Sequence, residues 1–132
     1  MVEPRFLTLA EVLLIHQDQV ARYGGAAGIR DLGLLKSAAG MPSATYGGEF
    51  LHTDLHEMAA AYLYHIVKNH PFVDSNKRVA VVCALVFLDL NGLEFFAPQD
   101  DLADMAIAAA SGEVSKAGVA EFIRRWSRSP KS

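Results

Sequence analysis

Apolar residues recur along this chain at the three- and four-residue spacing of amphipathic α-helices, with polar residues between them. Thr8 and Glu11 form a capping box that opens the first predicted helix, which runs to about residue 22. Asp31 is placed to cap a second, shorter helix, which a glycine and a proline close near residue 41. The first third of the chain is therefore predicted to be helical.

Two long apolar segments follow, and they are predicted to form the centre of the fold. The first begins at Thr53 or Asp54 and runs to about Asn69, with small alanines opposite its larger side chains. The second runs from Lys77 to Leu90, and its length favours a helix although its valines favour β structure locally. Both helices are expected to have neighbours on most faces.

The other segments are predicted to pack around this centre. Residues 92–98 are expected to form a short extended piece, helices are expected from residue 100 or 101 and after Ser115, and residues 127–132 are expected to fray. Residues 41–52 are rich in glycine and aromatic residues, which is typical of an ordinary connecting loop or of a lid over a site.

The composition is that of a globular domain. Of the 132 residues, 52% are hydrophobic and 20% are charged, which is enough to bury a core. The net charge of −3 disfavours nucleic-acid binding through bulk electrostatics. No apolar run is long enough for a membrane span and no signal peptide is recognised, so we expect a soluble, cytoplasmic protein. We predict one all-α domain over residues 1–132, a bundle of about six helices, with Cys83 as a small core residue.

Polar chemistry is concentrated in one stretch between the two central helices. It interrupts apolar sequence on both sides, and polar groups in such a place are costly unless they have a function. The stretch covers residues 70–78 and reads His70-Pro71-Phe72-Val73-Asp74-Ser75-Asn76-Lys77-Arg78. We expect it to be the active-site loop.

The second half of this loop suits a phosphate ligand. The helix that follows is predicted to begin near Lys77, and the unpaired N–H groups at a helix start attract anions. Ser75 is small enough to let a phosphate approach the backbone, and Asn76 is a natural N-cap. Lys77 and Arg78 add two cations.

Two residues in the first half take chemical roles if a phosphate binds. Asp74 is a hard oxygen ligand suited to Mg²⁺, which usually binds one or two carboxylates together with phosphate oxygens. Histidine ionises near neutral pH, so His70, which Pro71 places at the end of the preceding helix, is the candidate general base. Phe72 is expected to point inward as an anchor. Each residue alone is also typical of a helix end or a turn, but together they favour a site.

The loop resembles the signature of the Fic/Doc family, enzymes that transfer parts of nucleotides to protein hydroxyls. Typical adenylyl-transferring members have glycine at the positions of Ser75 and Lys77 and a second arginine at the position of Val81. Lysine at 77 is instead similar to the Doc branch, the death-on-curing toxins. Two earlier segments are also similar to that branch, Arg22-Tyr23-Gly24-Gly25 and Thr53-Asp54-Leu55.

This resemblance spans nearly the whole chain and implies the toxin of a toxin-antitoxin module. The implied activity is a protein kinase that uses ATP and Mg²⁺ to phosphorylate a threonine of translation elongation factor Tu. The implied partner is a Phd-type antitoxin, with DNA contacted only through it. The resemblance assigns catalysis to His70, Asp74, Asn76, Lys77 and Arg78, nucleotide binding to Ser75, Asn76, Lys77 and Arg78, and the metal to Asp74.

Lys77 is the residue that favours phosphate transfer over nucleotide transfer. Its side chain fills space that a glycine would leave for the nucleotide, so the nucleotide is expected to bind turned around, with its γ-phosphate toward His70. The alternatives are an adenylyltransferase and a catalytically silent module that binds an antitoxin. The remaining histidines are scattered and lack a neighbouring cysteine or carboxylate pair, so surface or core positions are favoured over zinc binding; they are His16, His52, His56 and His65.

Overall fold

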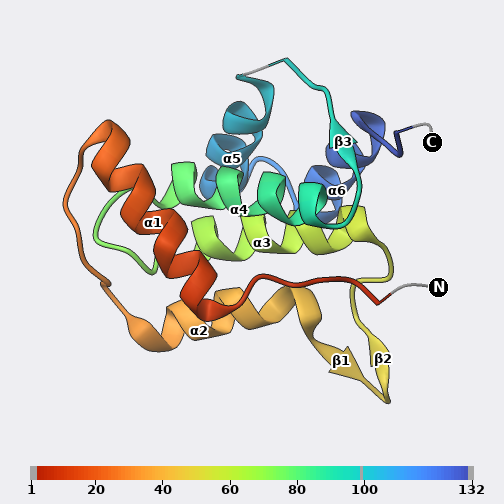
Figure 1. Cartoon of the computed structure of the whole chain (residues 1–132), viewed down its shortest axis with the longest axis horizontal. Coiled ribbons are helices and arrows are strands. Elements are labelled where there is room, and N and C mark those ends of the chain that lie inside the picture. Colours follow the sequence, from red (N-terminus) through yellow and green to blue (C-terminus); the bar gives the residue numbers. More distant parts are fainter. Residues whose placement is uncertain (1–2, 99, 131–132) are drawn as a thin grey trace.

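The computed structural model describes residues 3–98 and 100–130, which form a helical bundle around two central helices (Figure 1). Two antiparallel pairs of short strands lie at the edges of the bundle. The elements are α1 (Leu9–Tyr23), α2 (Leu32–Gly40), the 3-10 helix η1 (Met41–Ser43), β1 (Thr45–Tyr46), β2 (Glu49–Phe50), α3 (Leu55–Asn69), α4 (Asn76–Leu90), β3 (Glu94–Phe95), α5 (Asp101–Ser111), α6 (Lys116–Arg125) and β4 (Ser127–Arg128). The predicted all-α fold class is confirmed.

Capping side chains start four of the helices where the sequence predicts them. Thr8 and Glu11 form a complete capping box at the start of α1. Asp31, Asp54 and Ser115 each accept a hydrogen bond from the backbone N–H three residues later, at the starts of α2, α3 and α6. These local contacts satisfy N–H groups that a helix start leaves unpaired, which is why the boundaries are legible in the sequence.

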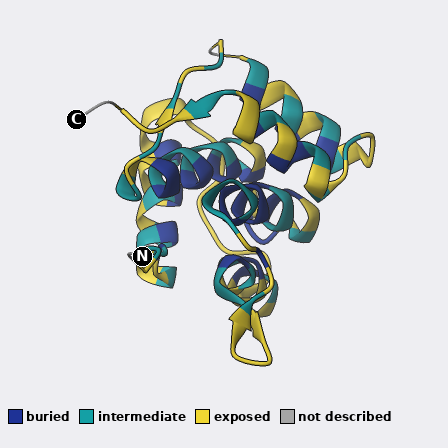
Figure 2. Cartoon of the chain, turned by 90° about the vertical axis from the view of Figure 1, so that its right-hand side faces the viewer, coloured by how far each residue is buried: buried dark blue, intermediate teal, exposed yellow. Residues whose placement is uncertain are grey.

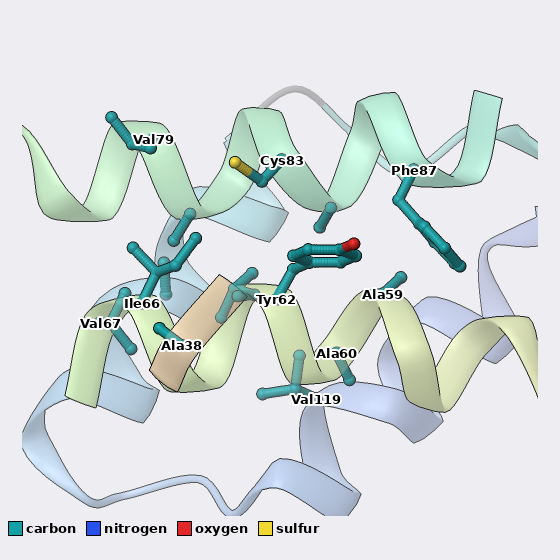
Figure 3. Close-up of a cluster of buried hydrophobic side chains, with 14 of the residues drawn as sticks. Ala38, Ala59, Ala60, Tyr62, Ile66, Val67, Val79, Cys83, Phe87 and Val119 are labelled. Atoms are coloured by element: carbon teal, nitrogen blue, oxygen red, sulfur yellow. The ribbon is translucent and has the colours of Figure 1, made fainter. Parts of the chain in front are cut away.

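Helices α3 and α4 lie side by side, and their facing side chains form the core (Figure 3). Tyr62 of α3 is fully buried, and its hydroxyl accepts the backbone N–H of Leu7 at 2.8 Å. Cys83 of α4 is also fully buried, and burial raises the pKa of its thiol to about 12. Cys83 is therefore a core residue, as predicted.

The other helices cover this pair on both sides. Helices α2 and α6 pack on α3, α1 packs on α4, and α5 packs on both central helices. Buried residues accordingly concentrate on the central helices, while the β1–β2 hairpin is exposed (Figure 2). Among the described residues, no helix is both long and apolar enough to cross a bilayer.

Two segments predicted to be irregular contain short strands. Residues 41–52 form η1 and a hairpin that turns at Gly47 and Gly48, both at positive φ. The hairpin lies at the opposite end of the long axis from the loop that joins α3 to α4, so it is not a lid over that loop (Figure 1).

The end of the chain is likewise more ordered than predicted. β4 pairs with β3, with Glu94 opposite Arg128 and Phe95 opposite Ser127. The expected extended piece at residues 92–98 is thus confirmed, and the expectation of fraying is wrong for residues 127–128. The two strands lie about 33 positions apart in the sequence, so the polar residues at 127–128 show no local sign that they form a strand. Residues 131–132 lie outside the described part of the chain.

Candidate active site

His70 ends α3 in a left-handed backbone conformation, with φ 50° and ψ 53°. Its N–H donates to the Ile66 carbonyl at 3.0 Å, and the residue is exposed. A residue with a Cβ adopts this conformation at a cost of about 1–2 kcal/mol, so surrounding contacts must hold it. The predicted position of His70 at the end of α3 is confirmed.

Phe72 and Asn76 fix the loop from the inside. The Phe72 ring is fully buried and stacks on the imidazole of His16, with ring centres 3.9 Å apart. The side chain of Asn76, itself buried, accepts the Phe72 N–H at 2.9 Å and donates to the Phe72 carbonyl at 2.9 Å. Phe72 is therefore the inward anchor that the sequence predicts.

The prediction that Asn76 caps α4 is wrong. Its amide is committed to Phe72, because two buried backbone groups of the loop would otherwise lack partners. Ser75 takes the cap position instead, in the left-handed region with φ 71° and ψ 17°, and its side chain makes no capping hydrogen bond. Helix α4 consequently begins at Asn76, one residue earlier than predicted.

The start of α4 offers a place for an anion. Val79 donates the first hydrogen bond of the helix to the Ser75 carbonyl at 3.0 Å. The three N–H groups before Val79 precede the helical ladder, at the positive end of the helix dipole. Lys77 is exposed at this start and adds a full positive charge. Backbone N–H groups together with a cation are the usual components of a phosphate site.

Asp74 presents an exposed carboxylate beside this helix start. One of its oxygens accepts the Ser75 N–H at 2.8 Å, and the other accepts the Ala26 N–H at 3.3 Å. These two backbone hydrogen bonds lower the pKa of Asp74, with a smaller contribution from the charge of Arg78. Asp74 is therefore ionised at neutral pH, as a metal-binding carboxylate must be.

A second segment, residues 24–31, runs beside the loop, and we refer to it as the strap (Figure 1). The carbonyl of Gly28 accepts the Val73 N–H at 3.1 Å, and Ile29 forms an antiparallel bridge with Phe72. Gly25 lies so close that a Cβ there would be 2.8 Å from Asp74 Oδ2. Sequence reasoning did not place the strap in the site. Its signals in the sequence are the similarity of Arg22-Tyr23-Gly24-Gly25 to the Doc branch and three glycines, Gly24, Gly25 and Gly28, which all have positive φ.

Arg78 connects α4 to the strap. Its Nη2 donates to the Gly24 carbonyl at 2.9 Å and to the Ser75 hydroxyl, and its guanidinium lies 5.6 Å from the centre of the Tyr23 ring. Its Nε is buried and has no hydrogen-bond partner among the described residues. The guanidinium therefore adds a fixed positive charge beside the start of α4, where it favours an anionic ligand.

Most of the predicted site residues are accessible from solvent in the loop and at the start of α4. His70, Asp74, Lys77 and the start of α4 face solvent, with Ser75 and Arg78 half-buried between them. The side chain of Asn76 is the exception, because it points into the loop. This arrangement combines a candidate base, an ionised carboxylate and an anion site, which together suit the transfer of a phosphorylated group.

Comparison with known proteins bears on the same region. A model of the Fic/DOC family matches residues 6–88, a range that includes both the loop and the strap. The chain belongs to the Fic/DOC family.

Two Doc proteins are similar to this member of the Fic/DOC family. Protein kinase doc of Escherichia phage P1 is 38% identical over 121 residues, which are 92% of this chain and 94% of that protein. Toxin Doc of Mycolicibacterium smegmatis is 41% identical over 78 residues, which are 59% of this chain and 60% of that protein. The resemblance read from the loop is therefore confirmed, including its Doc branch.

Proposed function

We propose that this Fic/DOC protein is a protein kinase toxin that transfers the γ-phosphoryl group of ATP to a threonine of elongation factor Tu. The observation that carries the proposal is the loop in which an exposed His70 and an exposed Asp74 precede the open start of α4. The similarity to a protein named protein kinase doc, over nearly all of both chains, supports phosphoryl transfer in particular.

The start of α4 binds the phosphates in this proposal. The backbone N–H groups of residues 76–78 hold phosphate oxygens, and Lys77 and Arg78 balance their charge. The side chain of Asn76 contributes indirectly, because its hydrogen bonds to Phe72 keep the loop in shape. Ser75 is small and makes no capping hydrogen bond, so we assign it a place beside the bound phosphate.

His70 acts as the general base. It takes the proton of the threonine hydroxyl while the hydroxyl oxygen forms a bond to the γ-phosphorus. The bond from that phosphorus to the bridging oxygen of ATP breaks, and ADP leaves. Since His70 is exposed at a helix end, a protein substrate can reach it without opening the core.

Asp74 fits a magnesium ion that is shared with the nucleotide. Its carboxylate is exposed and kept ionised, and oxygen is the ligand that Mg²⁺ prefers. Among the described residues, no group of three or more histidine, cysteine, aspartate or glutamate side chains could hold a metal by itself. A single carboxylate is consistent with Mg²⁺ bound partly through phosphates, where it would neutralise developing negative charge.

Lys77 sets which phosphorus reacts. Its side chain occupies the space beside the helix start that a glycine would leave empty, so the nucleotide binds with its γ-phosphate toward His70. We further propose that the chain acts in the cytoplasm, and that a Phd-type antitoxin binds and restrains it, contacting DNA on behalf of the complex.

The decisive experiment supplies two labels in parallel. The purified chain is incubated with elongation factor Tu, Mg²⁺ and ATP labelled at either the α- or the γ-phosphate. We expect γ-label on elongation factor Tu, its loss in His70→Ala, and a shift toward α-label in Lys77→Gly. Label from the α-phosphate alone in the parent chain would establish an adenylyltransferase instead.

A growth assay separates both enzymes from a silent binding module. Expression without antitoxin is expected to arrest growth, and His70→Ala is expected to relieve the arrest. If His70→Ala arrests growth as strongly as the parent chain does, the loop is not the source of toxicity.

A further inference from the structure

Arg30 of the strap holds the backbone on which His70 stands. Its Nε donates to the His70 carbonyl at 2.6 Å, and its Nη2 donates to the Asn69 carbonyl at 2.8 Å. Its own backbone N–H donates to the Pro71 carbonyl at 2.7 Å. One residue therefore binds three consecutive carbonyls where α3 ends and the loop begins.

The Asn69 and His70 carbonyls belong to the end of α3, and the Pro71 carbonyl belongs to the loop that follows. The last carbonyls of a helix have no partner within it, and they carry the negative end of the helix dipole. Pro71 has no N–H, so the residue after His70 cannot donate to a carbonyl of the last turn. A guanidinium from a distant segment meets both needs, because it is a cation with several N–H groups in a fixed fork.

We propose that Arg30 is a positioning residue for His70, acting on the carbonyl side of the strained residue while the strap fixes the rest of the loop. The neighbouring contacts support a fixed rather than an incidental placement. Asp31 N–H also donates to the Pro71 carbonyl at 3.1 Å, and the bridge between Ile29 and Phe72 continues the pairing along the loop. The role in catalysis rests on the proposed function, whereas the role in holding the loop does not.

Loss of Arg30 should affect kcat more than the KM for ATP. Arg30 contacts only backbone carbonyls at the His70 end, whereas the proposed phosphate site lies at the start of α4. Without the Arg30 guanidinium, the His70 imidazole should lose its fixed position. Misplacement of a catalytic group by about 1 Å can lower the rate by about 100-fold. The KM for ATP should change little, because Asp74, Ser75 and Arg78 keep their own contacts with each other and the strap.

The test compares Arg30→Gln with Arg30→Lys and a matched surface change, Arg125→Gln at the exposed end of α6. We expect Arg30→Gln to lower kcat by at least about tenfold with the KM for ATP within about twofold of the parent. Arg30→Lys should recover part of the rate, since an ammonium keeps the charge but not the two-pronged geometry. Arg125→Gln should match the parent.

Hydrogen exchange provides a readout that needs no activity. Amide exchange in residues 70–75 should speed up in Arg30→Gln and stay unchanged in Arg125→Gln, with exchange in α4 protected in both. A variant with parental kcat and parental exchange overturns the proposal, as does a loss of kcat that appears without faster exchange in the loop.

The same measurements separate this proposal from the proposed function. If the parent chain transfers no γ-phosphoryl group, the proposed function fails, and exchange alone decides the role of Arg30. Faster exchange in residues 70–75 then supports Arg30 as the residue that holds the loop, and unchanged exchange overturns it.

Discussion

Helix α3 carries histidines in two contrasting environments. At its C-terminal end, His70 is exposed and sits in a left-handed conformation. Along its body, His56 and His65 are partly buried, and His52 just before the helix is 6% exposed. We refer to His52, His56 and His65 as the histidine cluster. The imidazole at the C-terminal end of α3 is thus exposed to solvent, whereas the imidazoles of the histidine cluster are buried or partly buried.

The histidine cluster shows what burial does to these side chains. His65 Nε2 lies 3.0 Å from the Nζ of Lys116 on α6, and burial, with the Lys116 charge as a smaller cause, lowers the pKa of His65 to about 4. Burial also lowers the pKa of His52, of His56 and of Lys116. These imidazoles are therefore mostly neutral at pH 7, and His65 joins α3 to α6 through its contact with Lys116.

The surroundings of His70 differ, because its backbone is strained and its side chain is not buried. Two residues with side chains, His70 and Ser75, hold positive φ at either end of the loop, and they are the only such non-glycine residues in the described chain. Strain of this kind persists where the surroundings over-determine the backbone. Exposure combined with strain, more than the presence of a histidine, therefore distinguishes the candidate site in this bundle.

The largest expected contrast comes from removing one imidazole from each region. His70→Ala should lower phosphoryl transfer by about 10²–10⁴-fold, the usual contribution of a general base. Its free energy of unfolding should stay within about 0.5 kcal/mol of the parent or rise slightly, because the residue is exposed. Transfer of γ-label and urea unfolding measure the two effects.

His65→Ala is the matched change in the histidine cluster. It should lower the free energy of unfolding by about 1–3 kcal/mol, because it leaves a cavity and removes the partner of Lys116. Its kcat should remain near the parental value at temperatures where the variant is folded. Equal losses of activity in both variants would mean that the two regions are not functionally distinct.

This contrast was only half visible in the sequence. The loop was recognisable because its polar residues are adjacent, and the helices because their caps are local, as with Asp31, Asp54 and Ser115. The strap was not recognised, since its contacts join residues 39 to 54 positions apart and most of them use backbone atoms. The cap was misassigned to Asn76 because its type favours that place, while the need to satisfy Phe72 is tertiary.

The sequence did not predict the β1–β2 hairpin and the final strand β4 for a related reason. Strands of two residues are too short for an alternating pattern, although Gly47 and Gly48 are a typical hairpin turn. For the scattered histidines, the sequence left two alternatives open, a surface position or a core position. Which of them packs against Lys116 depends on how α6 docks, and that is not encoded within any one segment.

A second prediction concerns the close approach of Gly25 in the strap to Asp74 in the loop. In Gly25→Ala, the new Cβ would lie 2.8 Å from Asp74 Oδ2, at a backbone φ of 110° that side chains rarely adopt. Displacement of the carboxylate should lower the rate of transfer by about 10- to 100-fold and raise the Mg²⁺ concentration needed for half-maximal rate. Titration of activity with Mg²⁺ measures both effects.

Gly24→Ala separates the clash from the backbone strain. Gly24 has a φ of 80° as well, but a Cβ there meets nothing within 4 Å. It should lose about 1–3 kcal/mol of stability from backbone strain, as Gly25→Ala should, yet keep the parental Mg²⁺ dependence. If both variants need the same extra Mg²⁺, the contact between the strap and Asp74 is not the cause.

A third prediction uses pH to weigh the histidine cluster. In the folded chain the pKa of His65 is about 4, below the ordinary value of 6.5, so the unfolded chain binds more protons between these pH values. Stability is therefore fully present above about pH 6.5 and is lost as the pH falls toward 4. Between pH 7 and pH 5, the free energy of unfolding should drop by about 1–2 kcal/mol from this residue.

Urea unfolding at the two pH values measures this drop, and His65→Gln provides the comparison. Glutamine keeps a hydrogen-bond acceptor for Lys116 but does not titrate in this range. The variant should show a smaller loss of stability on acidification than the parent. The remainder belongs to the other histidines whose pKa values burial lowers, His16, His52 and His56. An undiminished loss in His65→Gln would contradict the assignment to His65.

The smallest expected effect concerns the strain at the other end of the loop. Ser75 holds a φ of 71°, and its hydroxyl accepts a hydrogen bond from Arg78. Ser75→Ala removes the hydroxyl but keeps the Cβ, whereas Ser75→Gly removes both. Glycine should therefore be more stable than alanine at this position by about 0.5–1 kcal/mol, because relief of the left-handed strain exceeds the entropy lost on folding glycine. Urea unfolding of the two variants gives this difference directly. A glycine variant no more stable than the alanine variant would show that the start of α4 does not store strain, and only His70 would then mark the loop as unlike the histidine cluster.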